Sequence, residues 1–136
     1  MIGLDTNVLV RYVLRDDVQQ AEVVDTLIEK CIAEHVLIVI SLLILQETEW
    51  VLRACAKIDK PSIITLFKAL LESADILIET EDILEEALLH FENSNADFSD
   101  CLMVAQYQHI ACDYMVTFDC KAAKIEGAIL LNWMAR

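Results

Sequence analysis

Glycine and proline are scarce in this chain, which contains two glycines and one proline among 136 residues. Their scarcity excludes collagen-like and low-complexity classes, which depend on these residues. Long apolar runs are missing too. The longest, from Val36 to Leu45, is about ten residues and is interrupted by Ser41, whereas a membrane-spanning helix needs roughly 20. We therefore expect no membrane span and a single domain over residues 1–136.

Pairs of cysteines at short spacing are also absent. The five cysteines are an odd number, and no two of them have the CxxC spacing. We expect reduced thiols that pack as small buried hydrophobic side chains. No basic segment precedes an apolar one at the N-terminus, because Asp5 follows at once, so we expect no secretory signal and a cytoplasmic location.

Positive charge is in short supply, since the formal net charge is -13. A protein that grips many phosphates usually carries a basic face, so we expect weak non-specific affinity for nucleic acids. No Lys or Arg occurs between Lys68 and Lys121, and this gap contains an acidic segment from Glu79 to Glu86. We interpret that segment as the solvated start of a helix, where acids oppose the helix dipole.

What the chain has in abundance is hydrophobic residues, at 57%. Their spacing predicts helices alternating with strands. Strands are expected at 2–4, 36–40, 74–78, 114–118 and 128–131, and helices at 6–14, 18–34, 42–56, 61–72, 80–92 and 97–109, with a short one from 121. The strand segments are too apolar to face water, which predicts an α/β fold with a parallel sheet between layers of helices.

Four acidic residues stand where apolar runs end or begin: Asp5, Glu47, Asp100 and Asp119. A carboxylate beside buried aliphatic chain costs free energy unless it is hydrogen-bonded, paired or bound to a cation. In parallel sheets, ligands bind beyond the carboxyl ends of the strands, so these acids can converge there. Converging carboxylates repel one another, and Mg²⁺ or Mn²⁺ relieves that repulsion with hard oxygen ligands.

The segments around these acids resemble the PIN-domain nucleases, particularly the VapC toxins of prokaryotic toxin-antitoxin pairs. The matching segments are Leu4–Arg11 (LDTNVLVR), Gln46–Arg53 (QETEWVLR), Ala96–Asp100 (ADFSD) and Thr117–Asp119 (TFD). The resemblance spans almost the whole chain and includes the order of the acids, their spacing and their neighbours.

The resemblance implies a three-layer α/β/α PIN-like fold with a central, mostly parallel sheet, and metal-dependent cleavage of RNA. Asp5 and Asp100 are implied as ligands of Mg²⁺ or Mn²⁺, directly or through water, while Glu47 and Asp119 complete the acidic pocket. One or two cations would activate water for in-line attack on a phosphodiester.

Four further residues are candidates for the same site. Asp97 lies one helical turn from Asp100 and either tunes the site or caps the helix. Thr6, Asn7 and Thr117 are expected to hydrogen-bond the carboxylates or a phosphate, with an ordinary helix cap as the alternative for Thr6.

Neighbouring charges need separate decisions. Glu49 lies two residues from Glu47, on a different side of the helix, so we exclude it from the site. Arg11 and Arg15 either contact RNA phosphates or pair with acids on the next helix.

The resemblance also implies partners, namely a cognate antitoxin and a second copy in a homodimer. A chain this acidic would attract a basic antitoxin segment. Two other functions stay open: a catalytically silent PIN-type binding module, and a Mg²⁺-dependent aspartyl-phosphate transfer domain. The second is disfavoured because Asn7 stands where a phosphatase would have its second Asp.

Overall fold

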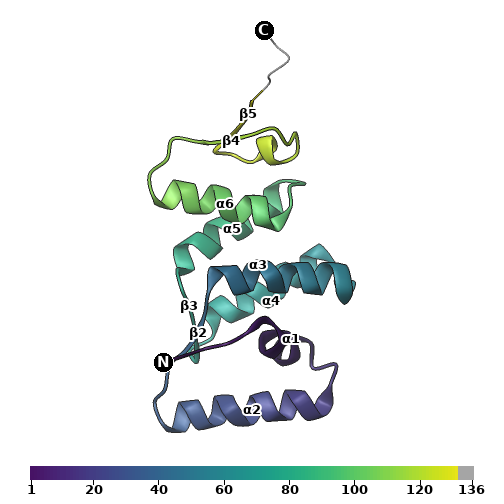
Figure 1. Ribbon diagram of the computed structural model, residues 1–136, viewed down its shortest axis with the longest axis vertical. Helices are drawn as coiled ribbons and strands as arrows, with labels where there is room; N and C mark the ends of the chain where they lie inside the picture. The colour runs from purple at the N-terminus through teal and green to yellow at the C-terminus, as the bar shows by residue number, and fades with distance from the viewer. Residues whose placement is uncertain (132–136) are drawn as a thin grey trace. The chain divides into compact units, whose positions relative to one another are not determined.

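The computed structural model describes residues 1–131, which lie in two compact units. The N-terminal unit comprises Met1–Glu81, and the C-terminal unit begins at Asp82. Figure 1 shows the elements of both units in chain order. The expected domain extends to residue 136, and its last five residues lie outside the described part of the chain.

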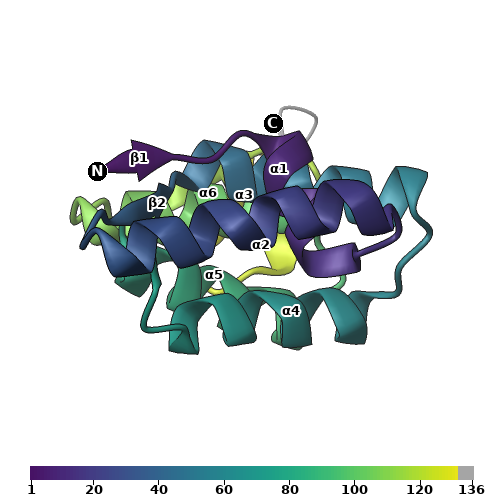
Figure 2. The same ribbon diagram turned by 90° about the horizontal axis from the view of Figure 1, so that it is seen from below.

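The N-terminal unit contains a parallel sheet with helices between its strands. Its elements are β1 (Ile2–Gly3), α1 (Thr6–Leu14), α2 (Val18–Ala33), β2 (Ile38–Ile40), α3 (Leu42–Trp50), α4 (Lys60–Glu72) and β3 (Ile76–Ile78). The strand order is β1-β2-β3, with Ile38 of β2 paired to Ile2 on one side and Ile76 on the other. The long helices α2 and α4 run in roughly the same direction (Figures 1 and 2).

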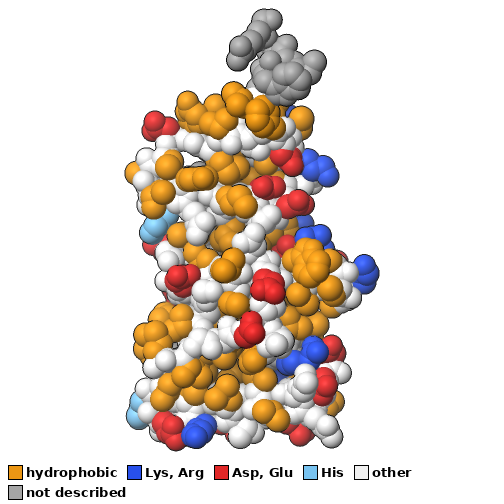
Figure 3. Space-filling view, viewed as in Figure 1, with side chains coloured by type: hydrophobic (Ala, Val, Ile, Leu, Met, Phe, Trp, Pro, Cys, Tyr) orange, Lys and Arg blue, Asp and Glu red, His pale blue; other side chains and the backbone are white. Residues whose placement is uncertain are grey.

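The C-terminal unit contains two helices and a parallel pair of strands. Its elements are α5 (Glu81–Asn93, from the unit boundary), α6 (Phe98–His109), β4 (Met115–Thr117), the 3₁₀ turn η2 (Ala122–Lys124) and β5 (Ala128–Leu130). Met115 of β4 pairs with Ala128 of β5. Hydrophobic side chains gather over β4 and β5 in Figure 3, and the paired Val116 and Ile129 are about half exposed.

Helix starts follow from capping side chains in the N-terminal unit. Asp17, Ser41 and Asp59 each accept a hydrogen bond from a backbone N–H three residues later, at 3.1, 3.2 and 3.1 Å. Such caps satisfy backbone donors that a helix leaves without partners. The boundaries of α1 agree with the expected 6–14, and the strand pairs are parallel as expected.

Several boundaries differ from the expectation. The helix expected over 42–56 is α-helical only to Trp50 and continues as the π-helical turn η1 (Val51–Cys55). The strands are also shorter than expected, with β2 covering three residues instead of the five from 36 to 40. Apolar composition marks where a strand lies, but backbone pairing decides its ends.

The expectation for the cysteines is half right. All five are free thiols, but only Cys31 and Cys101 are buried, whereas Cys55, Cys112 and Cys120 are exposed. The three exposed residues lie at the end of η1 or in loops of the C-terminal unit, outside the packed helix faces.

Candidate metal and nuclease site

Asp5 stands where β1 ends and α1 begins. Its Oδ1 accepts a hydrogen bond from the Thr6 backbone N–H at 2.7 Å, so Asp5, and not Thr6, is the cap residue of α1. The alternative role of Thr6 as a helix cap is therefore wrong. Thr6 is 6% exposed, and its Oγ1 has no hydrogen-bond partner among the described residues. A buried hydroxyl without a partner costs free energy, which favours a ligand or water at this position.

Asn7 is exposed and lines a cavity of about 470 Å³ between α1 and α2. The same cavity is lined by Arg11, whose Nε donates to Gln20 Oε1 and whose Nη1 lies 3.4 Å from Asp16 Oδ1. Arg11 is thus held by side chains at the start of α2.

Arg15 pairs with Asp25 on α2, with Nη1 3.0 Å from Oδ1 and Nη2 bonded to the other carboxylate oxygen. This hydrogen bond raises the pKa of Arg15 and lowers the pKa of Asp25. Arg15 therefore pairs with an acid on the next helix, as one of the two alternatives expects, whereas the acid beside Arg11 is Asp16, in the loop before α2.

Glu47 lies on α3 with an exposed side chain, and α3 packs against α1, the helix that Asp5 caps. Glu49 is 3% exposed and accepts a hydrogen bond from Arg53 Nε at 2.9 Å. The two acids therefore lie on different sides of the helix, as their spacing predicts. Glu49 is buried and hydrogen-bonded to Arg53, whereas Glu47 is exposed.

Glu79 is an acid whose role the sequence interpretation missed. It follows β3 directly, and its Oε1 accepts a hydrogen bond from the Leu42 backbone N–H at 2.9 Å. Its backbone N–H donates to Ile40 at 2.9 Å. Glu79 thus stabilises the start of α3 rather than of the helix that follows it, and an acid directly after an apolar strand was the available signal.

Three predicted acids of the C-terminal unit interact electrostatically. The pKa of Asp100 is raised, first by partial burial and then by the negative charges of Asp119 and Asp97. Asp97 occupies the position before α6, but its side chain makes no capping hydrogen bond. The side chain of Asp97 therefore does not cap the helix. It is exposed, and its charge contributes to the raised pKa of Asp100.

Asp119 is held by the turn after β4. Its Oδ1 accepts hydrogen bonds from the backbone N–H groups of Lys121 at 2.7 Å and Ala122 at 3.0 Å. Thr117 Oγ1 accepts from the Asp119 backbone N–H at 3.0 Å. Thr117 therefore orients the Asp119 backbone, and this turn leaves the second carboxylate oxygen without a described partner of its own.

A divalent cation fits the chemistry of these groups. Carboxylate oxygens are the ligands Mg²⁺ and Mn²⁺ prefer, and a cation would offset the like charges around Asp100. Among residues 1–131, no three His, Cys, Asp or Glu side chains are arranged to hold one metal ion together. The fit therefore rests on the donor set and on the partnerless Thr6 hydroxyl beside Asp5.

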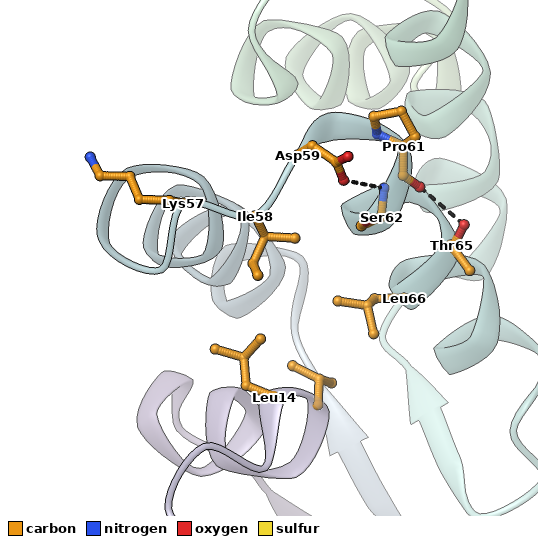
Figure 4. Close-up of a pocket in the computed structure, with 9 residues that line it drawn as sticks. Leu14, Lys57, Ile58, Asp59, Pro61, Ser62, Thr65 and Leu66 are labelled. Atoms are coloured by element: carbon orange, nitrogen blue, oxygen red, sulfur yellow. Dashed lines mark hydrogen bonds between the residues drawn. The ribbon is translucent and has the colours of Figure 1, made fainter.

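A larger cavity of about 690 Å³ lies elsewhere in the N-terminal unit (Figure 4). Leu14, Ile58 and Leu66 form its apolar part, while Asp59 and Thr65 along its rim are bonded within α4. None of the predicted site residues lines it. This cavity is therefore separate from the predicted site residues.

The chain matches the PIN domain family over residues 2–128 and belongs to that family. This match confirms the predicted fold class, α/β/α with parallel strands. PIN domains are commonly metal-dependent nucleases that act on RNA. No curated protein sequence matches the chain. Within the described residues, each helix is too short or too polar to cross a bilayer.

Proposed function

We propose that this protein is a Mg²⁺-dependent endoribonuclease and the toxin of a type II, VapBC-like toxin-antitoxin pair. The observation that supports the proposal is Asp100 of this PIN-family chain, a partly buried carboxylate whose pKa is raised by its burial and by the charges of Asp119 and Asp97. A bound cation would offset the repulsion that Asp100 experiences from Asp119 and Asp97.

In the proposed site, Asp5 and Asp100 hold Mg²⁺ or Mn²⁺, and Glu47, Asp97 and Asp119 complete the acidic pocket. When bound, the cation lowers the pKa of a coordinated water and neutralises charge on the leaving oxygen. We also propose that residues 1–136 form a single PIN domain, which the family match over residues 2–128 supports.

Three polar side chains have supporting roles in the proposed site. The Thr6 hydroxyl, which has no described partner, donates to a carboxylate or a phosphate oxygen. Asn7 offers its amide to RNA from the exposed face of α1. Thr117 keeps the Asp119 turn in place through the hydrogen bond from the Asp119 N–H.

The proposed setting is the cytoplasm, with a cognate antitoxin and a homodimer as the assemblies. The net charge of -13 supports an antitoxin whose binding segment is basic. Affinity for such an antitoxin should fall as ionic strength rises, because exposed charges are screened. An affinity that does not change with salt would contradict the electrostatic part of this proposal.

Cleavage of a panel of transfer, ribosomal and messenger RNAs tests the nuclease activity. Wild type should cleave with Mg²⁺ or Mn²⁺ and stop with a chelator, and Asp5→Asn should be inactive under all conditions. Asp113→Asn, an exposed acid outside the proposed site, is the matched control and should cleave like wild type.

Wild type that cleaves no RNA with either cation would contradict the enzyme proposal. RNA binding without cleavage would then support the alternative, a catalytically silent PIN binding module. Membership of the PIN family removes the aspartyl-phosphate transfer domain from consideration.

A further inference from the structure

A hydrogen-bonded chain of side chains joins α5, α6 and the turn before β5 at the end of the C-terminal unit away from Asp100. His90 on α5 is 6% exposed, and its Nε2 lies 2.9 Å from Oε1 of Gln108 on α6. The Gln108 Nε2 donates to the carbonyl oxygen of Glu126 at 3.2 Å. Glu86 Oε1 lies 3.5 Å from the same histidine nitrogen.

The partners determine how Gln108 is oriented. The Glu126 carbonyl can only accept, so the amide nitrogen of Gln108 must face it, and the amide oxygen must face His90. His90 therefore carries a proton on Nε2, whether its ring is neutral or charged. Reversing the Gln108 amide would turn its oxygen toward the Glu126 carbonyl, where two acceptors repel, so the Glu126 contact fixes one orientation of this amide.

Gly127 brings the backbone against this side chain. Its φ is +102°, a conformation that L side chains rarely adopt, and a Cβ there would lie 2.5 Å from Gln108 Nε2. The Gly127 carbonyl accepts a hydrogen bond from the N–H of Met115, the first residue of β4, at 2.8 Å. Gln108 thus holds the turn to which the start of β4 is bonded.

The dimensions of the two elements connect this contact to the acids. From Gln108 back to Asp100, α6 spans about 12 Å at 1.5 Å per residue. β4 covers Met115–Thr117, about 7 Å at 3.3 Å per residue, and Asp119 follows it in a turn. Because β4 starts at the Gln108 end and leads to Asp119, a shift of β4 along α6 would move Asp119 relative to Asp100. The charge of Asp119 does act on Asp100.

We propose that Gln108, oriented by His90, is a positioning residue that sets the register of β4 along α6 and so places Asp119 beside Asp100. The consequence for catalysis rests on the proposed nuclease function, whereas the register itself does not. Gln108 contacts neither acid, so its effect on cleavage is transmitted through Gly127 and Met115.

Gln108→Met tests the proposal, because it keeps the side-chain length and removes both hydrogen bonds. Gln106→Met is the matched control, since Gln106 lies on the same helix, is exposed, and its side chain makes no hydrogen bond within residues 1–131. Gln108→Glu is the second variant: it still accepts from His90 but cannot donate to the Glu126 carbonyl.

The metal probe is Mn²⁺, which broadens amide NMR signals near its binding site. In wild type and Gln106→Met, the Asp100 and Asp119 amide signals should broaden together. In both Gln108 variants the broadening of the Asp119 signal should weaken relative to that of the Asp100 signal. kcat for RNA cleavage should fall roughly tenfold with KM nearly unchanged, measured at a temperature where circular dichroism shows the variant fully folded, so that a loss of folded protein does not lower kcat.

A second readout needs neither metal nor RNA. The Met115 and Leu131 amides donate to Gly127 and Thr117 at 2.8 and 2.7 Å. Their hydrogen exchange should be about fivefold faster in the Gln108 variants, the factor that corresponds to losing about 1 kcal/mol of hydrogen bonding. Amides in the middle of α6 should exchange as in wild type.

The outcomes separate this proposal from the proposed function. Unchanged exchange in Gln108→Met, or equal broadening of both acids, overturns the positioning role even if the protein cleaves RNA. Faster exchange in Gln108→Met together with a wild type that cleaves no RNA supports the register role and contradicts the nuclease. A wild-type exchange pattern in Gln108→Glu would contradict the proposal that Gln108 sets the register of β4 through its hydrogen bond to the Glu126 carbonyl.

Discussion

The acidic residues of the two units of this chain have different surroundings. In the N-terminal unit, acids are used as partners: Asp5 and Glu79 accept backbone N–H groups at helix starts, and Glu49 and Asp25 pair with arginines. In the C-terminal unit, Asp100 has other acids for neighbours. Residues 82–131 contain nine acids and only two lysines, both after residue 120.

The difference separates structural acids from functional ones. An acid whose charge is compensated within the fold stabilises it, whereas an acid surrounded by like charges is maintained at a cost. The N-terminal unit contributes Asp5 and Glu47 to the proposed site, while other acids of this unit, such as Glu49 and Glu79, are hydrogen-bonded within the fold. The C-terminal unit contributes Asp100, to which the neighbouring Asp97 and Asp119 add like charge.

The largest expected effect follows from breaking that group. Asp100→Asn should lower cleavage by roughly 10²-fold or more, since even residues that only support metal ligands cost 10- to 100-fold. Stability should rise or stay the same, because the raised pKa shows that the folded protein disfavours the charged form. Activity assays and thermal unfolding without metal check both parts, with Asp113→Asn as the control.

The next effect concerns the buried pair of the N-terminal unit. Arg53→Met should lower the free energy of unfolding by about 2 kcal/mol, because it leaves the buried Glu49 carboxylate without this arginine. Adding Glu49→Gln should recover part of the loss, and Arg15→Met, at an exposed pair, should cost much less. Urea unfolding measures all three, and equal losses in the two arginine variants would contradict the role of burial.

The two glycines offer a matched comparison between the units. Gly127→Ala should destabilise by about 1–2 kcal/mol, because its φ is +102° and the new Cβ would meet Gln108. Gly3→Ala should change little, since the nearest atom to its Cβ is 3.9 Å away. In a Gln108→Ala background the Gly127→Ala cost should shrink, and a double-mutant cycle measures the coupling. Strict additivity would show that the two residues do not act together.

The smallest effect is a pH dependence in the N-terminal unit. The pKa of Asp25 is lowered by its hydrogen bond with Arg15, so its contribution to stability is present above the unfolded pKa of about 3.9 and is lost as the pH falls through the lower folded pKa. Asp25→Asn should therefore unfold with a weaker dependence on pH below about 4 than wild type. Acid unfolding curves of the two proteins can resolve this difference, and identical slopes below about pH 4 would contradict it.

Much of the fold could be predicted from local chemistry. The boundaries of α1 and the starts of α3 and α6 follow from helical spacing and from polar residues before each apolar run. The end of α3 could not be predicted in this way, since the apolar pattern continues through η1 while the hydrogen bonding changes. A change from α to π geometry leaves the composition untouched.

The site was predictable to a lesser degree. The acids themselves stand out by their places at the ends of apolar runs, and they remain proposed ligands. What the sequence did not reveal was the use of each carboxylate, such as Glu79 bonded to an amide 37 residues earlier. Gln108 and Gly127 carried no visible signal, because their contact joins residues 19 positions apart through one conformation of a side chain.

By itself, the sequence determined the alternation of helices and strands, the PIN-type order of acids and the shortage of cations between Lys68 and Lys121. These properties depend on local spacing and composition and not on contacts between distant segments. Only the tertiary structure decided which acids are compensated and which are not, since a pKa depends on burial and on neighbours from distant segments. That decision separates Glu49 and Glu79 from Asp100.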